Sequence, residues 1–382
     1  MKYRTLGKTG IKSSILGFGA MRLPLNSDNP EDVNLVETRK MLDYAVDNGV
    51  NMFDTALVYH TIDRSKPGVS ETILGNFLGE YDDLHISTKM PSWNILSWEY
   101  FDKTLDQHLE RLNRDSIEMF FVHSIKDSYY ETIKERGLYD FIDRAVDDGR
   151  IEHVGFSSHA SYDVLMQILS DYDKWEFALT QINYVDNEEN PGLKGLREFK
   201  KLDIGTMIME PLRGGQLAEN QPEPVQDLFD KSSKDFSPVE WALYYLWENS
   251  DINCVLSGMS SLEQVKCNVD LASNYRSGCL DSDDYRLLDD VKNLYSSLKN
   301  IPCTGCNYCM PCPFGVNIPK CFYEFNMDKL SGSNNQSVQY RFHLHDDKKA
   351  HNCTKCGKCS SVCPQSIDIP SWLGVVEDHF GE

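Results

Sequence analysis

The sequence predicts an α/β protein, a (β/α)8 barrel followed by a small cysteine-rich domain. Three observations support this prediction. Eight short apolar runs alternate with segments of helical period over the first 290 residues, the length of 382 residues exceeds what one such barrel needs, and nine of the twelve cysteines lie at or beyond Cys303. Strands that alternate with helices over about 250 residues are typical of a closed parallel barrel.

The predicted strands are short apolar runs separated by longer segments. In chain order they are ILGFG (15–19), NMFDT (51–55), LHISTK (84–89), IEMFFVH (117–123), HVGFSS (153–158), FALTQIN (177–183), GTMIME (205–210) and NCVLSG (253–258).

Helices are predicted between the strands. In the segment EDVNLVETRKMLDYAVDNG, the side chains of Leu35, Leu42, Ala45 and Val46 share one face, and Gly49 stands where a helix commonly ends. Segments of this kind are expected to form the outer layer of the barrel.

An open doubly wound sheet is the alternative fold. Its nucleotide-binding signature is G-x-G-x-x-G, but the segment from Gly17 to Arg22 lacks the third glycine and no helix follows it closely. The barrel is therefore favoured. The opening KYRTLGKTGIKSS predicts a hairpin that turns at Lys8, Thr9 and Gly10, and we expect it to plug the barrel floor.

The charge pattern excludes several classes of partner. The net charge is −21, whereas binding to nucleic acids or anionic membranes depends on clustered Lys and Arg. No segment approaches the roughly 18 consecutive apolar residues of a membrane span, and no apolar stretch follows the first basic residues as in a secretory signal. We expect a soluble, cytoplasmic protein that binds neither nucleic acid nor membranes.

Ionisable residues end three consecutive predicted strands. These are Asp54, Lys89 and His123, and Tyr59 follows Asp54 by five residues. Active sites of such barrels lie at the carboxyl ends of the strands, where these side chains would converge. A phenol has a pKa of about 10, and a neighbouring ammonium favours its ionised form. We therefore expect Lys89 to make Tyr59 a proton donor, Asp54 to keep Lys89 charged, and His123 to orient a carbonyl oxygen or relay a proton.

The first 290 residues resemble the aldo/keto reductase family. The resemblance is carried, in order, by FDTALVY (53–59), STK (87–89), FVH (121–123), GFSSH (155–159), QINY (181–184), EPLRGG (210–215) and LSGMSSLEQVKCN (256–268). It implies a barrel that binds NADP or NAD across its top. It also implies a catalytic set matching Asp54, Tyr59, Lys89 and His123, with Tyr59 as the acid that protonates the carbonyl.

The same resemblance implies which residues bind the nucleotide. Those expected to line the nicotinamide are Gly19, Ala20, Met21, Ser157, Ser158, Gln181 and Met209. Those expected to hold the pyrophosphate and adenosine are Pro211, Leu212, Gly214, Ser257, Gly258, Met259, Gln264 and Asn268. Trp93, Trp98 and Tyr184 are candidate walls of the substrate pocket.

Two departures from the family pattern affect the nucleotide site. Met209 stands where many members place an aromatic ring against the nicotinamide. Gln264 stands where an arginine often binds the adenosine 2′-phosphate, and glutamine brings no positive charge. Lys266 is a candidate substitute. The choice between NADP and NAD therefore stays open.

Two cysteine runs predict iron–sulfur clusters. The second run, Cys353, Cys356, Cys359, Cys363 and a proline, matches the bacterial [4Fe-4S] signature C-x2-C-x2-C-x3-C-P. The first run is Cys303, Cys306, Cys309 and Cys312, also followed by proline. In two-cluster folds the fourth cysteine of each run binds the other cluster.

We therefore predict two [4Fe-4S] clusters with crossed ligands. One is expected at Cys303, Cys306, Cys309 and Cys363, and the other at Cys353, Cys356, Cys359 and Cys312. The first run is one residue short before its last cysteine, which leaves Cys321 as an alternative to Cys312. Zinc sites and disulfides are further alternatives, but zinc usually takes two separated cysteine pairs.

The two parts of the chain differ in charge as well as in cysteine content. Residues 301–382 hold 7 Lys and Arg against 8 Asp and Glu, a net charge of −1. Residues 1–300 hold the other 31 Lys and Arg against 51 Asp and Glu, a net charge of −20. We predict a barrel domain over residues 1–290 and a ferredoxin-type domain over 291–382. The whole chain resembles a subgroup of aldo/keto reductases with a C-terminal 4Fe-4S domain. A helix or two is expected between Asn317 and Asn352, with SGSNNQS as the most flexible stretch.

Three functions are compatible with this sequence. The favoured one is a nicotinamide-dependent carbonyl reductase or alcohol dehydrogenase, whose clusters dock or exchange electrons with a partner at the C-terminal domain. In the second, the clusters pass single electrons to a substrate or to a flavin in the barrel. Nicotinamide transfers two electrons as a hydride and a cluster transfers one at a time, so a flavin would be needed to connect the two. In the third, the protein is a non-catalytic redox sensor, against which the intact catalytic set argues.

Overall fold

The computed structural model describes residues 1–79, 81, 83–95, 97–188, 191–218, 221–297, 301–331 and 339–381. These residues divide into two compact units. The barrel unit comprises residues 1–182, 186–211 and 246–279, and the C-terminal unit comprises residues 183–185, 212–245 and 280–382. The boundary that the sequence suggests near residue 290 stays a prediction.

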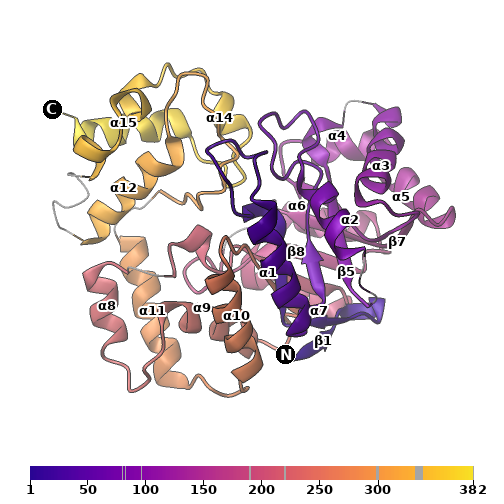
Figure 1. The fold of residues 1–382 in the computed structure, drawn as a ribbon, viewed down its shortest axis with the longest axis horizontal. Coiled ribbons are helices and arrows are strands. Elements are labelled where there is room, and N and C mark those ends of the chain that lie inside the picture. The colour runs from indigo at the N-terminus through magenta and orange to yellow at the C-terminus, as the bar shows by residue number, and fades with distance from the viewer. Residues whose placement is uncertain are drawn as a thin grey trace. The chain divides into compact units, whose positions relative to one another are not determined.

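The barrel unit contains a closed barrel of eight parallel strands, as predicted (Figure 1). Neighbouring strands are also neighbours in the sequence, and the last strand pairs with the first. The strands are β3 (Leu16–Gly19), β4 (Met52–Asp54), β5 (His85–Pro91), β6 (Ile117–Ile125), β7 (Ile151–Ser158), β8 (Phe177–Gln181), β9 (Gly205–Met209) and β10 (Cys254–Ser257).

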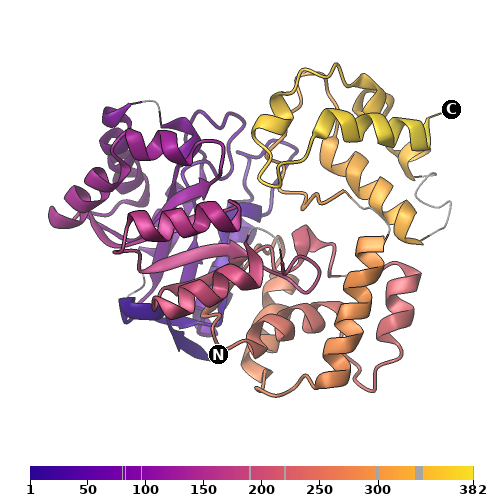
Figure 2. The same cartoon turned by 180° about the vertical axis from the view of Figure 1, so that it is seen from behind.

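Helices cover the outside of the strands, as both views show (Figures 1 and 2). In the barrel unit they are α1 (Leu35–Asp47), α2 (Ser70–Leu78), α3 (Trp98–Leu112), α4 (Tyr130–Glu135), α5 (Leu138–Asp147), α6 (Tyr162–Asp171), α7 (Gly192–Lys201) and α10 (Leu262–Asn274). None of the described helices is both long and apolar enough to cross a membrane.

Helix α1 forms where the periodicity predicts it, but its buried face is shifted. Leu42 and Ala45 are fully buried, whereas Leu35, predicted to share their face, is 50% exposed. Met41 and Thr38 are buried in its place. Leu35 is the first residue of the helix, directly after the capping Asn34, and half of its surface stays exposed there.

The opening residues form the predicted hairpin, from β1 (Tyr3–Thr5) and β2 (Lys12–Ser14). Leu6 and Ile11, between the two strands, are buried in the same cluster as inward-facing side chains of the barrel such as Met119 and Phe121. The hairpin therefore closes the floor, at the end opposite to the carboxyl ends of the strands.

The C-terminal unit is helical. It contains α8 (Glu223–Phe229), most of α9 (Pro238–Glu248), α11 (Ser282–Ser297), α12 (Ile318–Ser331), α14 (Lys358–Ser361) and α15 (Ile369–Phe380). Helices α12 and α15 lie side by side over a core that includes Phe322, Phe325 and Leu373. The predicted helix after Asn317 is therefore confirmed, while residues 332–337 of the segment SGSNNQS lie outside the described residues.

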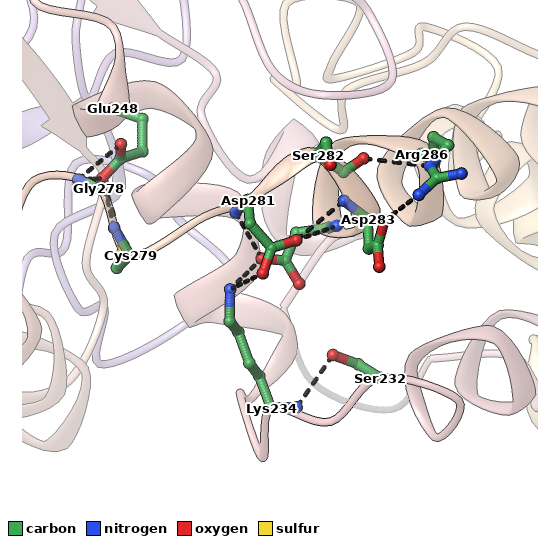
Figure 3. A network of polar contacts seen from close by, with 10 residues as sticks. Ser232, Lys234, Glu248, Gly278, Cys279, Asp281, Ser282, Asp283 and Arg286 are labelled. Carbon is green, nitrogen blue, oxygen red and sulfur yellow. Dashed lines mark hydrogen bonds and ion pairs between the residues drawn. The ribbon is translucent and has the colours of Figure 1, made fainter.

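The start of α11 is anchored by ionic contacts (Figure 3). The Lys234 ammonium pairs with the carboxylates of Asp281, at 3.4 Å, and of Asp284. Asp281 also accepts hydrogen bonds from the backbone N–H groups of Asp283 and Asp284. These two N–H groups lie in the first turn of the helix, where no backbone carbonyl is available to accept from them. The loop between α8 and α9 is thereby tied to α11.

Candidate functional site

Three neighbouring strands bring the predicted catalytic residues to one rim of the barrel. Asp54 is the last residue of β4 and pairs in register with Ser87 of β5. Lys89 lies two residues further along β5, and His123 of β6 pairs with Pro91. Because the strands are parallel, their carboxyl ends meet at the same rim.

The ammonium of Lys89 joins the other groups of this site. Its Nζ lies 2.5 Å from Asp54 Oδ2, 2.7 Å from the carbonyl oxygen of Thr55 and 3.1 Å from Tyr59 Oη. Lys89 is only 1% exposed. Three acceptors match the three protons of an ammonium, so the charge is held in a fixed position beside the phenol.

Ser87 is a further polar contact of this site, and the sequence motifs assign it no role. Its hydroxyl donates to Asp54 Oδ1 at 2.7 Å. Burial raises the pKa of Asp54, and the contacts with Lys89 and Ser87 counteract this rise. Side chains two residues apart on a strand share a face, so the position of Ser87 relative to Lys89 is a signal that could have identified it.

His123 lies against Tyr59 and Trp93. The ring centroids of His123 and Tyr59 are 6.0 Å apart, and those of His123 and Trp93 are 5.0 Å apart. Burial lowers the pKa of His123 well below its ordinary value, and the charges of Lys89 and Arg64 lower it further. His123 is therefore a neutral imidazole at neutral pH, suited to hydrogen bonding.

Of the three aromatic residues proposed as pocket walls, Trp93 contacts the catalytic set. Trp98 instead packs against Phe101, with the Arg144 guanidinium 4.6 Å from its ring centroid. Tyr184 belongs to the C-terminal unit, where its ring lies 6.3 Å from that of Tyr245.

The residues implied to bind a nucleotide lie at strand ends or in the following segments. Gly19 ends β3, with Ala20 and Met21 in the next turn. The ends of four further strands carry Ser157 and Ser158, Gln181, Met209 and Ser257. All of these residues belong to the barrel unit and lie at its carboxyl rim.

Two residues of α10 fix the loop after β10. Asn268 Nδ2 donates to Ser257 Oγ at 3.0 Å, and the backbone N–H of Ser260 donates to Gln264 Oε1 at 2.8 Å. The loop that holds Gly258 and Met259 is therefore shaped by the side chains that the resemblance assigns to adenosine.

Arg22 is a cationic side chain beside this loop that the sequence analysis missed. A Cβ atom placed on Gly258 would lie 3.1 Å from Cδ of Arg22, and Ser260 Oγ donates to the Arg22 carbonyl at 2.9 Å. Lys266, the predicted substitute for an arginine, lies elsewhere, with its ammonium 5.8 Å from the ring of Tyr44 on α1. Residue 22 and residue 258 are too far apart in the chain for local pattern to relate them.

The segment after β9 makes a tight turn from Leu212 to Leu217, hereafter the 212–217 loop. The backbone N–H groups of Gly215 and Leu217 both donate to the carbonyl oxygen of Leu212, at 2.9 and 3.1 Å. Gly214 adopts a φ of 66°, which glycine tolerates. Pro211 belongs to the barrel unit, and the 212–217 loop belongs to the C-terminal unit.

The first cysteine run and Cys363 line one pocket of the C-terminal unit. The pocket is partly open to solvent, and its walls include Cys303, Cys306, Cys309 and Cys363. Burial raises the pKa of the Cys309 thiol, and the charges of the other three raise it further. Four such thiolates are stable together only around a cationic centre, which the iron of a cluster supplies.

The remaining cysteines form a second group. Burial raises the pKa of Cys359, backbone hydrogen bonds lower it, and the charges of Cys353 and Cys312 raise it again. Cys312 therefore lies with the second run despite its shorter spacing. Cys321 lies elsewhere, with its thiol 3.6 Å from the Lys348 carbonyl oxygen.

This donor chemistry fits the crossed ligand sets expected from the sequence. All twelve cysteines belong to the described residues, and none forms a disulfide. Over the described ranges, no three His, Cys, Asp or Glu side chains form a group that could hold a single metal ion. A cubane differs from such a site, because each thiolate binds a different iron at its own corner.

Comparisons with known proteins agree with both parts of the chain. A model of the aldo/keto reductase family matches residues 15–292, and a model of a 4Fe-4S dicluster domain matches residues 302–367. L-galactose dehydrogenase of Arabidopsis thaliana is 27% identical over 322 residues, which cover 77% of this chain and 96% of that protein.

Two further comparisons concern a second relative and the fold. 6-dehydroglucose reductase of Novosphingobium aromaticivorans is 28% identical over 262 residues, which cover 64% of this chain and 81% of that protein. The solved holo form of aldo-keto reductase AKR11C1 from Bacillus halodurans superposes on this chain with a TM-score of 0.63 at 22% identity. The superposition covers 76% of this chain and 96% of that one.

Proposed function

Because the chain belongs to the aldo/keto reductase family and carries a 4Fe-4S dicluster domain, we propose that it reduces a carbonyl, or oxidises the corresponding alcohol, with NADP or NAD and with Tyr59 as the acid. One observation carries the proposal. The Lys89 ammonium lies 3.1 Å from Tyr59 Oη and 2.5 Å from Asp54, so the phenol stands beside a fixed positive charge.

Each member of the catalytic set has a role in this reaction. A bound nicotinamide would supply hydride to the carbonyl carbon. Tyr59 gives its phenolic proton to the carbonyl oxygen, and Lys89 stabilises the phenolate that remains. Asp54 offsets the cost of burying the ammonium, and neutral His123 orients the oxygen. In the reverse direction the phenolate accepts the proton of the alcohol.

The nucleotide is proposed to bind along the carboxyl ends of β3, β7, β8, β9 and β10, as the family resemblance implies. The rim position of Ser157, Ser158 and Gln181 supports this assignment. The hydrogen bond from Asn268 to Ser257 and the neighbouring cation of Arg22 support placing the adenosine end at the loop after β10.

The C-terminal unit is proposed to hold two [4Fe-4S] clusters with crossed ligands. The shared pocket of Cys303, Cys306, Cys309 and Cys363 supports the first set. The clusters would exchange electrons with a protein partner, or with a flavin in the barrel under the one-electron alternative. Sugar-derived carbonyls are the first substrates to test, since two relatives are named for galactose and glucose compounds.

Replacement of the proposed acid tests this function. Tyr59→Phe removes the proton donor without changing the ring, so kcat for carbonyl reduction is expected to fall about 10²- to 10⁴-fold. Binding of NADPH or NADH, measured by nicotinamide fluorescence, should change little. Tyr172→Phe is the matched control, because Tyr172 is a buried tyrosine hydrogen-bonded to Asp143 at 2.8 Å among the outer helices. Turnover by Tyr59→Phe at the wild-type rate would refute the proposal.

Removal of the clusters distinguishes the two catalytic alternatives. Hydride transfer from nicotinamide needs no iron, so cluster-free protein should still reduce a carbonyl at saturating nucleotide. If turnover disappears with the iron while the barrel remains folded by circular dichroism, the electrons pass through the clusters, and the one-electron alternative is correct.

A further inference from the structure

The 212–217 loop is hydrogen-bonded to the first cysteine of the first run. Gln216 Nε2 donates to the carbonyl oxygen of Cys303 at 2.6 Å. Both residues belong to the C-terminal unit, although 87 positions separate them in the chain. A segment that the resemblance assigns to nucleotide pyrophosphate is thus joined directly to a cluster-ligand loop.

The Gln216 side of this bond is firmly held. The Gln216 backbone N–H donates to the Arg213 carbonyl at 3.2 Å, and Gln221 Nε2 donates to the Gln216 carbonyl at 2.9 Å. Gln221 in turn accepts from the hydroxyl of Tyr295, at 3.2 Å. Tyr295 is buried on α11, the helix whose start is anchored by Lys234, and the Arg213 guanidinium lies 5.6 Å from its ring centroid.

The Cys303 side is also held. Asn326 of α12 is 3% exposed and binds Ile301 twice, accepting its N–H at 2.8 Å and donating to its carbonyl at 2.7 Å. The Cys303 N–H donates to the same Ile301 carbonyl at 2.7 Å, and the Gly305 N–H donates to Cys303 Sγ at 3.4 Å. Because both segments are held in place, a displacement of the Cys303 loop would change the hydrogen bond to Gln216, and through it the position of the 212–217 loop.

We propose that Gln216 is a positioning residue that couples nucleotide binding at the 212–217 loop to the presence of the cluster at Cys303, Cys306, Cys309 and Cys363. This inference rests on the proposed function. A cluster held by Cys303 and its partners would fix the Cys303 loop, and the hydrogen bond from Gln216 would then hold the 212–217 loop in one conformation. Without iron, the partly buried Cys303, Cys306 and Cys309 and the buried Cys363 would lack a common centre, so the Cys303 loop would relax and the 212–217 loop would lose one anchor.

The coupling is reciprocal, because a cluster that tightens nucleotide binding must itself be retained more firmly when the nucleotide is bound. One neutral hydrogen bond corresponds to an effect of about 3- to 10-fold on a binding constant. Nucleotide should therefore slow the loss of visible cluster absorbance in the presence of an iron chelator, and this readout does not depend on turnover.

Binding measurements on wild type and on variants of Gln216 and Gln226 test the coupling. Wild type, Gln216→Met and Gln226→Met are prepared anaerobically with clusters and after iron removal, and NADPH and NADH are titrated by fluorescence. Methionine keeps the size of glutamine but cannot donate to the Cys303 carbonyl. Gln226 of α8 is the matched control, because it makes an exposed hydrogen bond to Asp230, the residue after that helix, at 2.7 Å.

The expected pattern is non-additive. Iron removal should weaken nucleotide binding by wild type and by Gln226→Met about 3- to 10-fold. Gln216→Met with its clusters should already bind as weakly as iron-free wild type, and iron removal should weaken it little further. Gln216→Lys, which restores a donor of similar reach, should recover most of the affinity.

The alternative outcomes separate this inference from the proposed function. The coupling is refuted, while the proposed function stands, if clustered Gln216→Met binds the nucleotide as tightly as clustered wild type. It is also refuted if iron removal weakens nucleotide binding by the same factor in Gln216→Met as in wild type. If clustered wild type binds neither NADPH nor NADH, the proposed function is refuted and the coupling with it. Unchanged circular dichroism of Gln216→Met shows that the variant is folded.

Discussion

Lys89 is an ammonium in a nearly dry site, and the residues around it decide what Tyr59 can do. Moving such a charge out of water costs several kcal/mol unless close partners replace the water. Asp54 and the Thr55 carbonyl supply two of these contacts, and Tyr59 is the third. The phenol of Tyr59 therefore accepts the ammonium proton that Asp54 and the Thr55 carbonyl leave available, and this contact would connect burial of the charge to the proposed acid role of Tyr59.

Arg22 is predicted to favour NADP over NAD. A guanidinium suits a 2′-phosphate, and Arg22 stands next to Gly258 whereas Gln264 carries no charge. Arg22→Met should weaken NADPH binding about tenfold or more, corresponding to about 1.4 kcal/mol. NADH binding should change less than twofold. Fluorescence titration measures both constants, and an equal loss for the two nucleotides would contradict a role at the 2′-phosphate.

His159 is predicted to make the barrel sensitive to acid. Burial lowers its pKa to about 3, and its Nδ1 is buried with no hydrogen-bond partner among the described residues. The unfolded histidine takes up a proton below a pH of about 6.5 while the folded one does not. Stability is therefore lost as the pH falls, by about 1.4 kcal/mol per pH unit between about 6.5 and 3.

The substitution His159→Gln removes this titration. Urea unfolding of the barrel, followed by tryptophan fluorescence at pH 7 and pH 5, should show a smaller difference between the two pH values for the variant than for wild type. An identical difference would show that protonation of His159 does not contribute to acid sensitivity.

At the scale of elements, the eight strands and the opening hairpin could be predicted because their signals are local. Apolar runs, helical periods and the Lys8-Thr9-Gly10 turn each lie within a short window. The buried face of α1 was predicted less well, because the cover over Leu35 depends on neighbouring elements. The strand ends gave Asp54, Lys89 and His123, and alternation along β5 could have added Ser87.

The parts of the site that could not be predicted are contacts between distant segments. Arg22 reaches Gly258, and Gln216 reaches Cys303, but neither pair shares a motif. The sequence did predict Cys312 with the second run, but its shorter spacing left Cys321 as an alternative, and only the fold separates the two. Such contacts follow from the path of the whole chain, and no local pattern encodes them.

The hairpin plug is predicted to be intolerant of side chains at Gly7. Its φ is 48°, and an added Cβ would lie 2.2 Å from the backbone nitrogen of Gly205. Gly10 has a φ of 78° but nothing within 4 Å, so Gly10→Ala is the matched control. Gly10→Ala should cost about 1 kcal/mol of backbone strain. Gly7→Ala should cost about 1–3 kcal/mol more, because of overlap.

Urea unfolding of both variants measures this difference in the free energy of unfolding. Equal values for Gly7→Ala and Gly10→Ala would show that the close approach to β9 is relieved by movement of the hairpin, and that the plug is not rigidly seated.

At the scale of the whole molecule, the two cysteine groups differ in their access to solvent. Cys363 is 7% exposed, whereas Cys356 and the adjacent Lys355 and Lys358 are exposed. The near-neutral last part of the chain also repels an acidic protein less than the first part, which carries −20. We therefore predict that an acidic one-electron carrier would exchange electrons with the proposed second cluster.

Charge reversal tests this docking site. Lys355→Glu combined with Lys358→Glu should lower the second-order rate of cluster reduction by an acidic carrier several-fold, because like charges then face each other. Lys12→Glu, at an exposed position of the hairpin, should leave the rate unchanged. The wild-type rate should fall little with added salt, since the near-neutral surface attracts weakly. A steep loss with salt would contradict this account.

The unequal exposure of the two thiolate groups has a practical consequence. With the two proposed clusters in place, dissolved oxygen is expected to reach the one beside the exposed Cys356 before the one beside the buried Cys363, so that oxidative loss of iron begins at the second cluster. Material handled aerobically should then pass through a long-lived stage with about half of its iron. An iron assay at that stage would reflect how long the sample was exposed to air, and would underestimate the number of iron atoms that the protein can bind.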